Sequence, residues 1–229
     1  MNSEVMNLSV ADIEERSFIG KVYRWMGIGL LITAITAYFV VSTGFVYNLA
    51  SNTMLFYGTL IAEFGLVIFL SSRIQKMSAE AATASFVIYS ALNGVTFSLL
   101  LLIYTGASIA STFMITALTF GAMSAYGYFT KRNLTSMGSY LRMALFGLII
   151  ASVINIFWAN GTMYWIISYV GVLLFVGLTA YDTQKIKRMG ASVEGVQTTQ
   201  KVAIMGALML YLDFINLFLM LLRILGGRK

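Results

Sequence analysis

Seven long apolar stretches, separated by short polar linkers, dominate the pattern of hydrophobic and polar positions along the chain. They cover residues 25–41, 54–70, 81–103, 108–129, 141–158, 164–181 and 202–225. A helix that crosses the hydrocarbon core of a bilayer needs about 20 mostly apolar residues. The pattern therefore predicts an all-α integral membrane protein with seven transmembrane helices. We expect the polar residues 1–23 to form a cytoplasmic N-terminal tail, and residues 24–229 to form a single seven-helix transmembrane domain.

The basic residues lie mainly on one side of this predicted membrane. Twelve of the 15 Lys and Arg fall before the first stretch or beside the linkers after the second, fourth and sixth, with Arg142 counted in the fourth linker. By the positive-inside rule, that side and the N-terminus are cytoplasmic. Seven crossings place the C-terminus outside, although it ends in Arg228 and Lys229. A re-entrant last segment would return it to the cytoplasm, but residues 202–225 are long enough for a full crossing, which we favour.

Composition agrees with a membrane protein and removes several classes of function. Hydrophobic residues make up 59% of the chain and charged residues 10%, whereas soluble domains carry about 25% charged residues. The net charge of +6 is carried by short loops, so it indicates membrane topology and no nucleic-acid partner. The chain has no His and no Cys, which excludes histidine triads, histidine pH switches and thiolate sites. We expect no enzymatic activity.

Five charged residues lie inside or at the ends of the apolar stretches, where ionisable groups are costly and are functional candidates by default. They are Glu63, Arg73, Asp182, Asp213 and Arg223. Glu63 and Arg73 are ten residues apart, as are Asp213 and Arg223, which is about 15 Å of helix axis in each case. If the second and seventh spans are antiparallel neighbours, Glu63 meets Arg223 and Arg73 meets Asp213. For Glu63 and Arg223, a structural ion pair is favoured over a transport role.

Asp182 and Asp213 together form the candidate pH sensor. Asp182 ends the sixth span, which faces the start of the seventh, so it can share the inner half of the bundle with Asp213 and Arg73. Two close carboxylates do not both ionise easily, and without His this coupled pair is the one candidate for sensing pH near neutrality. Taken alone, Asp182 is also consistent with a solvated interfacial residue near Lys185. Asp213, in the apolar run 210–222, has no such simple explanation.

Two segments resemble the signature of the Bax inhibitor-1 family. They are GVLLFVGLTAYDTQKIK at residues 171–187, and LYLDFINLFL at 210–219 followed by LLR at 221–223. The resemblance covers nearly the whole chain and implies six helices packed around a central C-terminal helix. It also implies a pH-sensitive calcium leak, with Asp182 and Asp213 as the paired sensor and Arg73 as their basic partner. Glu63 and Arg223 match the family's intramembrane acid–base pair.

We therefore expect a passive, pH-modulated Ca²⁺ leak in which Asp182 and Asp213 bind or gate the ion and Arg73 latches them. Carboxylate oxygens suit a hard cation of this kind. Two alternatives stay open: a membrane-embedded regulator of other membrane proteins, of the stress or cell-death suppressor type, and a proton-coupled cation transporter. The expected partners are the lipid bilayer and Ca²⁺ as the transported ion, with no organic cofactor. The compact loops favour a bacterial inner membrane.

Overall fold

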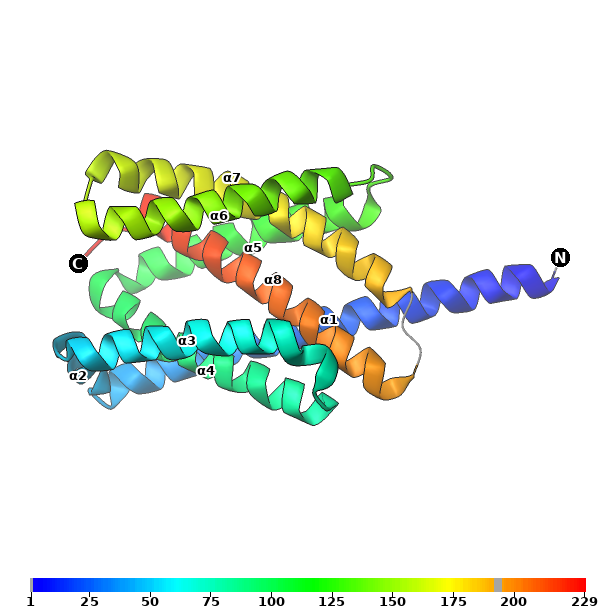
Figure 1. The fold of residues 1–229 in the computed structure, drawn as a ribbon, viewed down its shortest axis with the longest axis horizontal. Coiled ribbons are helices and arrows are strands. Elements are labelled where there is room, and N and C mark those ends of the chain that lie inside the picture. Colours follow the sequence, from blue (N-terminus) through cyan, green and yellow to red (C-terminus); the bar gives the residue numbers. More distant parts are fainter. Residues whose placement is uncertain (1, 192–194) are drawn as a thin grey trace. The chain divides into compact units, whose positions relative to one another are not determined.

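The computed structural model describes residues 2–191 and 195–229, and it describes side chains for 14–191, 195 and 197–229 (Figure 1). The helices are α1 (Asn2–Ser42), α2 (Phe45–Ser51), α3 (Thr53–Arg73), η1 (Ile74–Lys76), α4 (Ala79–Ile103), α5 (Gly106–Phe129), α6 (Thr135–Trp158), α7 (Gly161–Gly190) and α8 (Val196–Leu225). No strand occurs in the ranges that the structure describes. The prediction of an all-α fold is confirmed.

Seven of these helices contain segments that are long and apolar enough to cross a membrane. The segments are Glu14–Ser42, Thr53–Lys76, Ala79–Ile103, Gly106–Phe129, Thr135–Trp158, Gly161–Gly190 and Gln197–Leu225. Each predicted apolar stretch lies inside one of them, which confirms the seven expected spans. The helices are longer than the apolar stretches because polar residues continue the backbone hydrogen bonding beyond them. Thus α1 begins at Asn2, so residues 2–23, expected as a tail, continue the first helix, and their side of the membrane stays a prediction.

The chain has no proline, so other residues form the turns at the helix ends. Gly44 follows α1 with a φ of +75°, in the left-handed region that favours glycine. Asn52 then caps α3, because its Oδ1 accepts a hydrogen bond from the Leu55 N–H at 3.0 Å. Ala159 closes α6 at a φ of +43°, and its N–H donates to the Asn155 carbonyl at 2.9 Å. These turns permit the short connections between consecutive spans.

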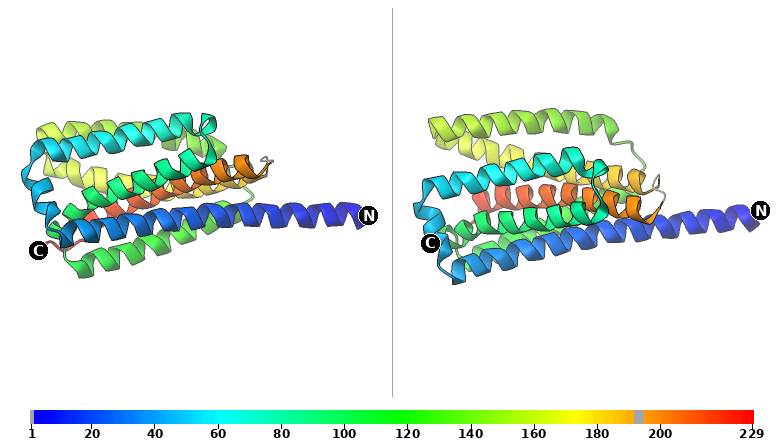
Figure 2. Two further views of the ribbon diagram at one scale, coloured as in Figure 1. Left: turned by 90° about the horizontal axis from the view of Figure 1, so that it is seen from below. Right: turned by 60° about the horizontal axis from the view of Figure 1, so that its bottom comes forward.

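The chain forms two compact units, of which the first comprises Met1–Ile103 and Ile186–Tyr211. Within it, α1 lies along α4, and α3 lies beside α4 (Figure 2). Glycine permits the close approach of α1 and α4, because a Cβ on Gly94 would lie 2.6 Å from the Thr33 carbonyl oxygen. The buried Tyr211 of α8 joins the same core, with its hydroxyl 2.7 Å from Thr33 Oγ1. The Thr33 hydroxyl also donates to the Ser90 carbonyl at 2.9 Å.

The second unit comprises Tyr104–Lys185 and Leu212–Lys229, so it contains α5, α6, most of α7 and the second half of α8. Figure 1 shows α6 and α7 as an antiparallel hairpin within it. Gly127 of α5 packs directly against the backbone of Ala180 on α7, where any Cβ would overlap it. Phe214 of α8 contacts Phe113 and Phe120 of α5 edge-to-face, at centroid distances of 5.3 and 5.4 Å.

Burial separates the seven spans into lipid-facing and enclosed helices. In α3 and α6, 6% of the most apolar window is buried, whereas in α8 the share is 67%. A helix surrounded by lipid exposes its apolar side chains, and an enclosed helix buries them. The C-terminal helix thus has the largest buried share of the seven, and it carries Asp213.

Candidate functional site

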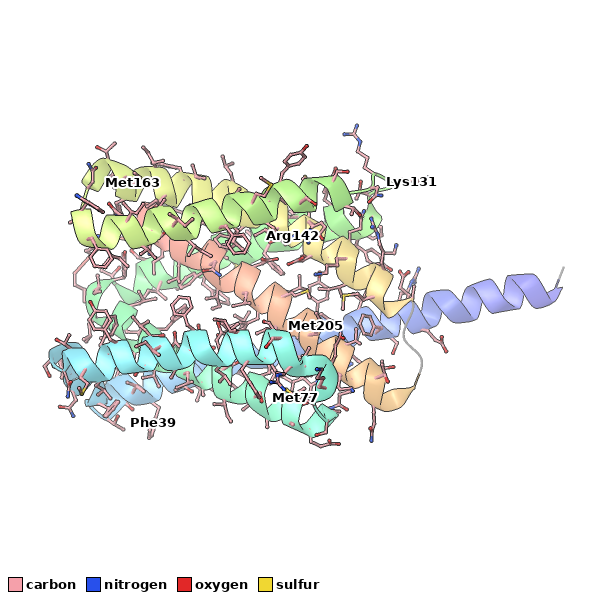
Figure 3. The ribbon with its side chains drawn as sticks, in the orientation of Figure 1. Phe39, Met77, Lys131, Arg142, Met163 and Met205 are labelled. Atoms are coloured by element: carbon pink, nitrogen blue, oxygen red, sulfur yellow. The ribbon has the colours of Figure 1, made fainter. Side chains whose placement is uncertain are left out.

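Four consecutive residues of α7, Tyr181 to Gln184, project to different sides of the helix because successive residues are about 100° apart. Tyr181 points to α6, where Arg142 Nη1 donates to its hydroxyl at 2.9 Å. The Arg142 guanidinium carbon also lies 5.7 Å from the centroid of that ring. Figure 3 labels Arg142 on α6. Gly138 makes room for this contact, because a Cβ there would overlap the Tyr181 ring.

The last two residues of the same segment fix α7 to α5 and to the connection after it. Thr183 Oγ1 donates to Ser124 Oγ on α5 at 3.4 Å. Gln184 bridges the α5–α6 connection, since its Nε2 donates to the Arg132 carbonyl at 2.8 Å and its Oε1 accepts from the Leu134 N–H at 2.9 Å. Three of the four side chains therefore orient this part of α7 firmly, which sets the direction of the fourth, Asp182.

Asp182 points to α8, where its carboxyl group is in hydrogen-bonding contact with that of Asp213. Asp213 is 4% exposed, and Asp182 is half-buried. An ionised carboxylate can only accept hydrogen bonds, so this contact requires a proton on one of the two groups. Asp213 Oδ2 is buried and has no hydrogen-bond partner within the part of the chain that the structure describes. A buried polar atom without a partner is costly, so this oxygen suits a proton, a water molecule or a passing cation.

Two cations of the second unit act electrostatically on this pair. Lys185, one turn after Asp182 on α7, acts on both carboxyl groups, and Arg142 acts on Asp182. Sequence reasoning missed Arg142 because it counted this residue in a linker. It lies seven residues after the start of α6, and a charge within an apolar helix is the signal that could have identified it.

Of the other three predicted site residues, Arg73 and Glu63 belong to the first unit, and Arg223 lies ten residues after Asp213 on α8. Arg73 is exposed at the end of α3 in the first unit. Glu63, also in the first unit, is half-buried and accepts a hydrogen bond from Thr96 Oγ1 at 2.8 Å. Arg223 belongs to the second unit, with its guanidinium carbon 5.5 Å from the centroid of the Tyr164 ring. The latch role of Arg73 and the pairing of Glu63 with Arg223 stay predictions.

The carboxyl pair cannot by itself hold a resident calcium ion. Two carboxyl groups offer at most four oxygens, whereas Ca²⁺ takes six to eight oxygen ligands. Among the described residues, no group of three or more His, Cys, Asp or Glu could hold a metal. Asp182 and Asp213 as ligands of a transported Ca²⁺ therefore remain a prediction.

The structure defines a helical membrane protein with seven candidate spans and two aspartates in contact between its last two helices. Comparison with known proteins identifies its family. A family model described as Inhibitor of apoptosis-promoting Bax1 matches residues 15–229. Inner membrane protein YbhL of Escherichia coli (strain K12) is 50% identical over 217 residues, which is 93% of each chain. A protein of Borreliella burgdorferi is 46% identical over 94% of each chain. A protein of Rickettsia prowazekii is 44% identical over 93% of this chain and 91% of its own. The chain belongs to the Bax inhibitor-1 family.

Proposed function

We propose that this membrane protein conducts Ca²⁺ passively and that the pair Asp182–Asp213 makes the flux depend on pH. The observation that carries the proposal is the carboxyl–carboxyl contact between α7 and α8, with one buried oxygen left without a partner. The resemblance of the two aspartate motifs to the family's signature supports the same assignment. The ion is cargo here, and its hard-cation character matches carboxylate oxygens.

Proton binding changes the contact between the two helices. With one proton shared, the two carboxyl groups attract each other and hold α7 to α8. When that proton leaves, two anions face each other in a poorly hydrated place, which is strongly unfavourable. Lys185 and Arg142 offset part of the repulsion. The two carboxylates then separate, and their oxygens become available to a cation. This separation also alters the route of the ion along α7 and α8.

We place the protein in a bacterial inner membrane with its N-terminus in the cytoplasm. The excess of Lys and Arg on one side of the spans supports this orientation. The printed name of the Escherichia coli relative, an inner membrane protein, supports the location. Arg73 lies on the cytoplasmic side in this arrangement, and we propose that it assists the carboxyl pair as a latch.

The test is Ca²⁺ entry into dye-loaded liposomes that contain only the purified protein, between about pH 6 and 8. Asp182→Asn and Asp213→Asn should each remove most of the pH dependence, and the double variant should remove no more than either alone. Glu80→Gln is the matched control, because it neutralises an exposed carboxylate at the start of α4. Unchanged pH profiles in both single variants would overturn the proposed sensor.

The same liposomes separate this proposal from its two rivals. A membrane-embedded regulator would give no Ca²⁺ flux without its partner. A proton-coupled transporter would give a saturable flux that stops when the proton gradient is collapsed. Arg73→Gln and Arg142→Gln are compared in one series to distinguish the two candidate basic partners of the carboxyl pair. Substitution of the residue that acts as the latch should shift the pH at which the Ca²⁺ flux changes.

A further inference from the structure

The basic C-terminus, which does not fit the one-sided distribution of Lys and Arg, is held in a defined place in the second unit. Arg228 forms a β-bridge with Tyr104, just after α4. The Thr105 N–H donates to the Gly227 carbonyl at 3.1 Å, and the Gly227 N–H donates to Ser108 Oγ at 3.0 Å. Gly226 permits the approach, because a Cβ there would lie 2.6 Å from the Tyr104 ring. We call residues 226–229 the C-terminal strap.

The C-terminal strap places Arg228 in a cluster of two guanidinium groups and two phenols. Tyr104, which the bridge holds beside Arg228, interacts electrostatically with both Arg228 and Tyr164. Arg223 lies over the other side of this cluster, 5.5 Å from the centroid of the Tyr164 ring. Arg228 is exposed, and Arg223 is half-buried. The cluster therefore offers several N–H donors at a surface, ordered by contacts from three different elements.

The acidic side chains of the same unit lie far from these cations along α7 and α8. Its two acidic side chains are Asp182 and Asp213. Asp213 precedes Arg223 by ten residues of α8, which is about 15 Å along the helix axis. Asp182 lies 18 residues after Tyr164 on α7, or about 27 Å. The cluster is thus a site of positive charge at the end of the unit that lies opposite the carboxyl pair.

Exposed indole rings mark the depth of this end in the membrane. Trp158, the last residue of α6, is 76% exposed, and Trp165, the fifth residue of α7, is 45% exposed. Trp is enriched where the hydrocarbon core meets the headgroups. Tyr164 is adjacent to Trp165, so we expect the guanidinium cluster to lie at headgroup level. The anions that are abundant at this level are lipid phosphates.

We propose that Arg228, together with Tyr104, Tyr164 and Arg223, binds the phosphate of an anionic phospholipid. The planar guanidinium matches phosphate oxygens with two parallel N–H donors, and the phenols orient it. The proposal is independent of the Ca²⁺ flux, and its test is made on Arg228 and Tyr104. It also gives the C-terminal basic residues a local role outside the positive-inside pattern.

Native mass spectrometry of the detergent-purified protein, titrated with phosphatidylglycerol, tests the proposal. The wild type should retain the lipid, and Arg228→Gln should weaken its binding about tenfold, because one charge-assisted hydrogen-bonding group is lost. Tyr104→Phe keeps the ring and removes the hydroxyl, so it should weaken binding as well, even if Arg228→Gln folds poorly. Arg132→Gln, which changes an exposed arginine at the opposite end of the unit, is the matched control.

Two outcomes would overturn the site. Equal loss of phosphatidylglycerol in Arg132→Gln and Arg228→Gln would mean that lipid binding follows only the net charge. Equal retention of phosphatidylcholine and phosphatidylglycerol by the wild type would mean that anionic headgroups are not selected. A separate arm adds inorganic phosphate: displacement of the lipid only at high concentration fits the proposal, and tight binding of free phosphate would instead assign the site to a soluble anion.

Discussion

Asp213 combines burial with an oxygen that has no partner, and this combination separates it from the other charged residues of the spans. Glu63 has a hydroxyl donor in Thr96, and Arg223 has the face of Tyr164. The sequence already singled out Asp213, because a carboxyl group in the apolar run 210–222 has no simple structural reason. Its contact with Asp182 follows from the meeting of α7 and α8, while Arg142 and Lys185 beside it depend on side-chain directions that spacing does not give.

A double-mutant cycle at the residue scale tests the predicted pair of Glu63 and Arg223. Glu63→Gln and Arg223→Met should each lower the free energy of unfolding in detergent by roughly 3–5 kcal/mol if they leave a buried charge without its partner. The double variant should then cost less than the sum of the two. Pairing Arg223→Met with Glu80→Gln is the control and should be additive. Additivity in both cycles would mean that Glu63 and Arg223 do not touch.

At the scale of the helices, the hydrophobic pattern was sufficient to find all seven spans, because the bilayer fixes the length of an apolar helix. It did not find where helices end. The apolar stretch 164–181 stops at Tyr181, but α7 continues to Gly190, since Thr183 and Gln184 form hydrogen bonds to neighbouring segments there. Hydropathy records the composition of a segment and carries no information on such contacts.

The contact between α5 and α7 leads to a prediction about two glycines of one helix. Gly127→Ala should lower the free energy of unfolding by at least about 1–3 kcal/mol, because its Cβ would overlap the Ala180 backbone. Gly121→Ala meets no atom within 4 Å, so it should be neutral or stabilising by up to about 1 kcal/mol through helix propensity. Thermal melting in detergent measures both. Equal effects of the two substitutions would contradict the packing of Gly127 on α7.

At the scale of the whole molecule, the chain divides into two units, and Asp182 and Asp213 lie close in the sequence to the residues where that division falls. On α7, the second unit ends at Lys185, three residues after Asp182. On α8, the first unit ends at Tyr211, two residues before Asp213. Each unit has its own polar contacts, Thr33 with Tyr211 in the first and Arg142 with Tyr181 in the second. The division into units was not predicted from sequence, because no break in composition accompanies it.

Membrane topology is tested with introduced cysteines, which the chain permits because it has none of its own. In intact inverted and right-side-out vesicles, Lys131→Cys should react with an impermeant reagent only from the cytoplasmic side. Thr162→Cys and Lys229→Cys should react only from the other side. Both Lys131 and Thr162 are exposed, so their reactivity reports on sidedness. Labelling of Lys229→Cys from the cytoplasmic side alone would contradict seven full crossings.

The most direct test of the central claim is to measure the proton on the carboxyl pair itself. The chain has three aspartates, Asp12, Asp182 and Asp213, so carboxyl-¹³C aspartate separates their infrared bands from those of the glutamates. In lipid nanodiscs, titrated with rising pH, the wild type should show a protonated aspartate band that disappears over the pH range in which Ca²⁺ flux changes. Asp213→Asn should abolish this coincidence. A band that stays constant while flux changes, or that titrates identically in Asp213→Asn, would contradict the account.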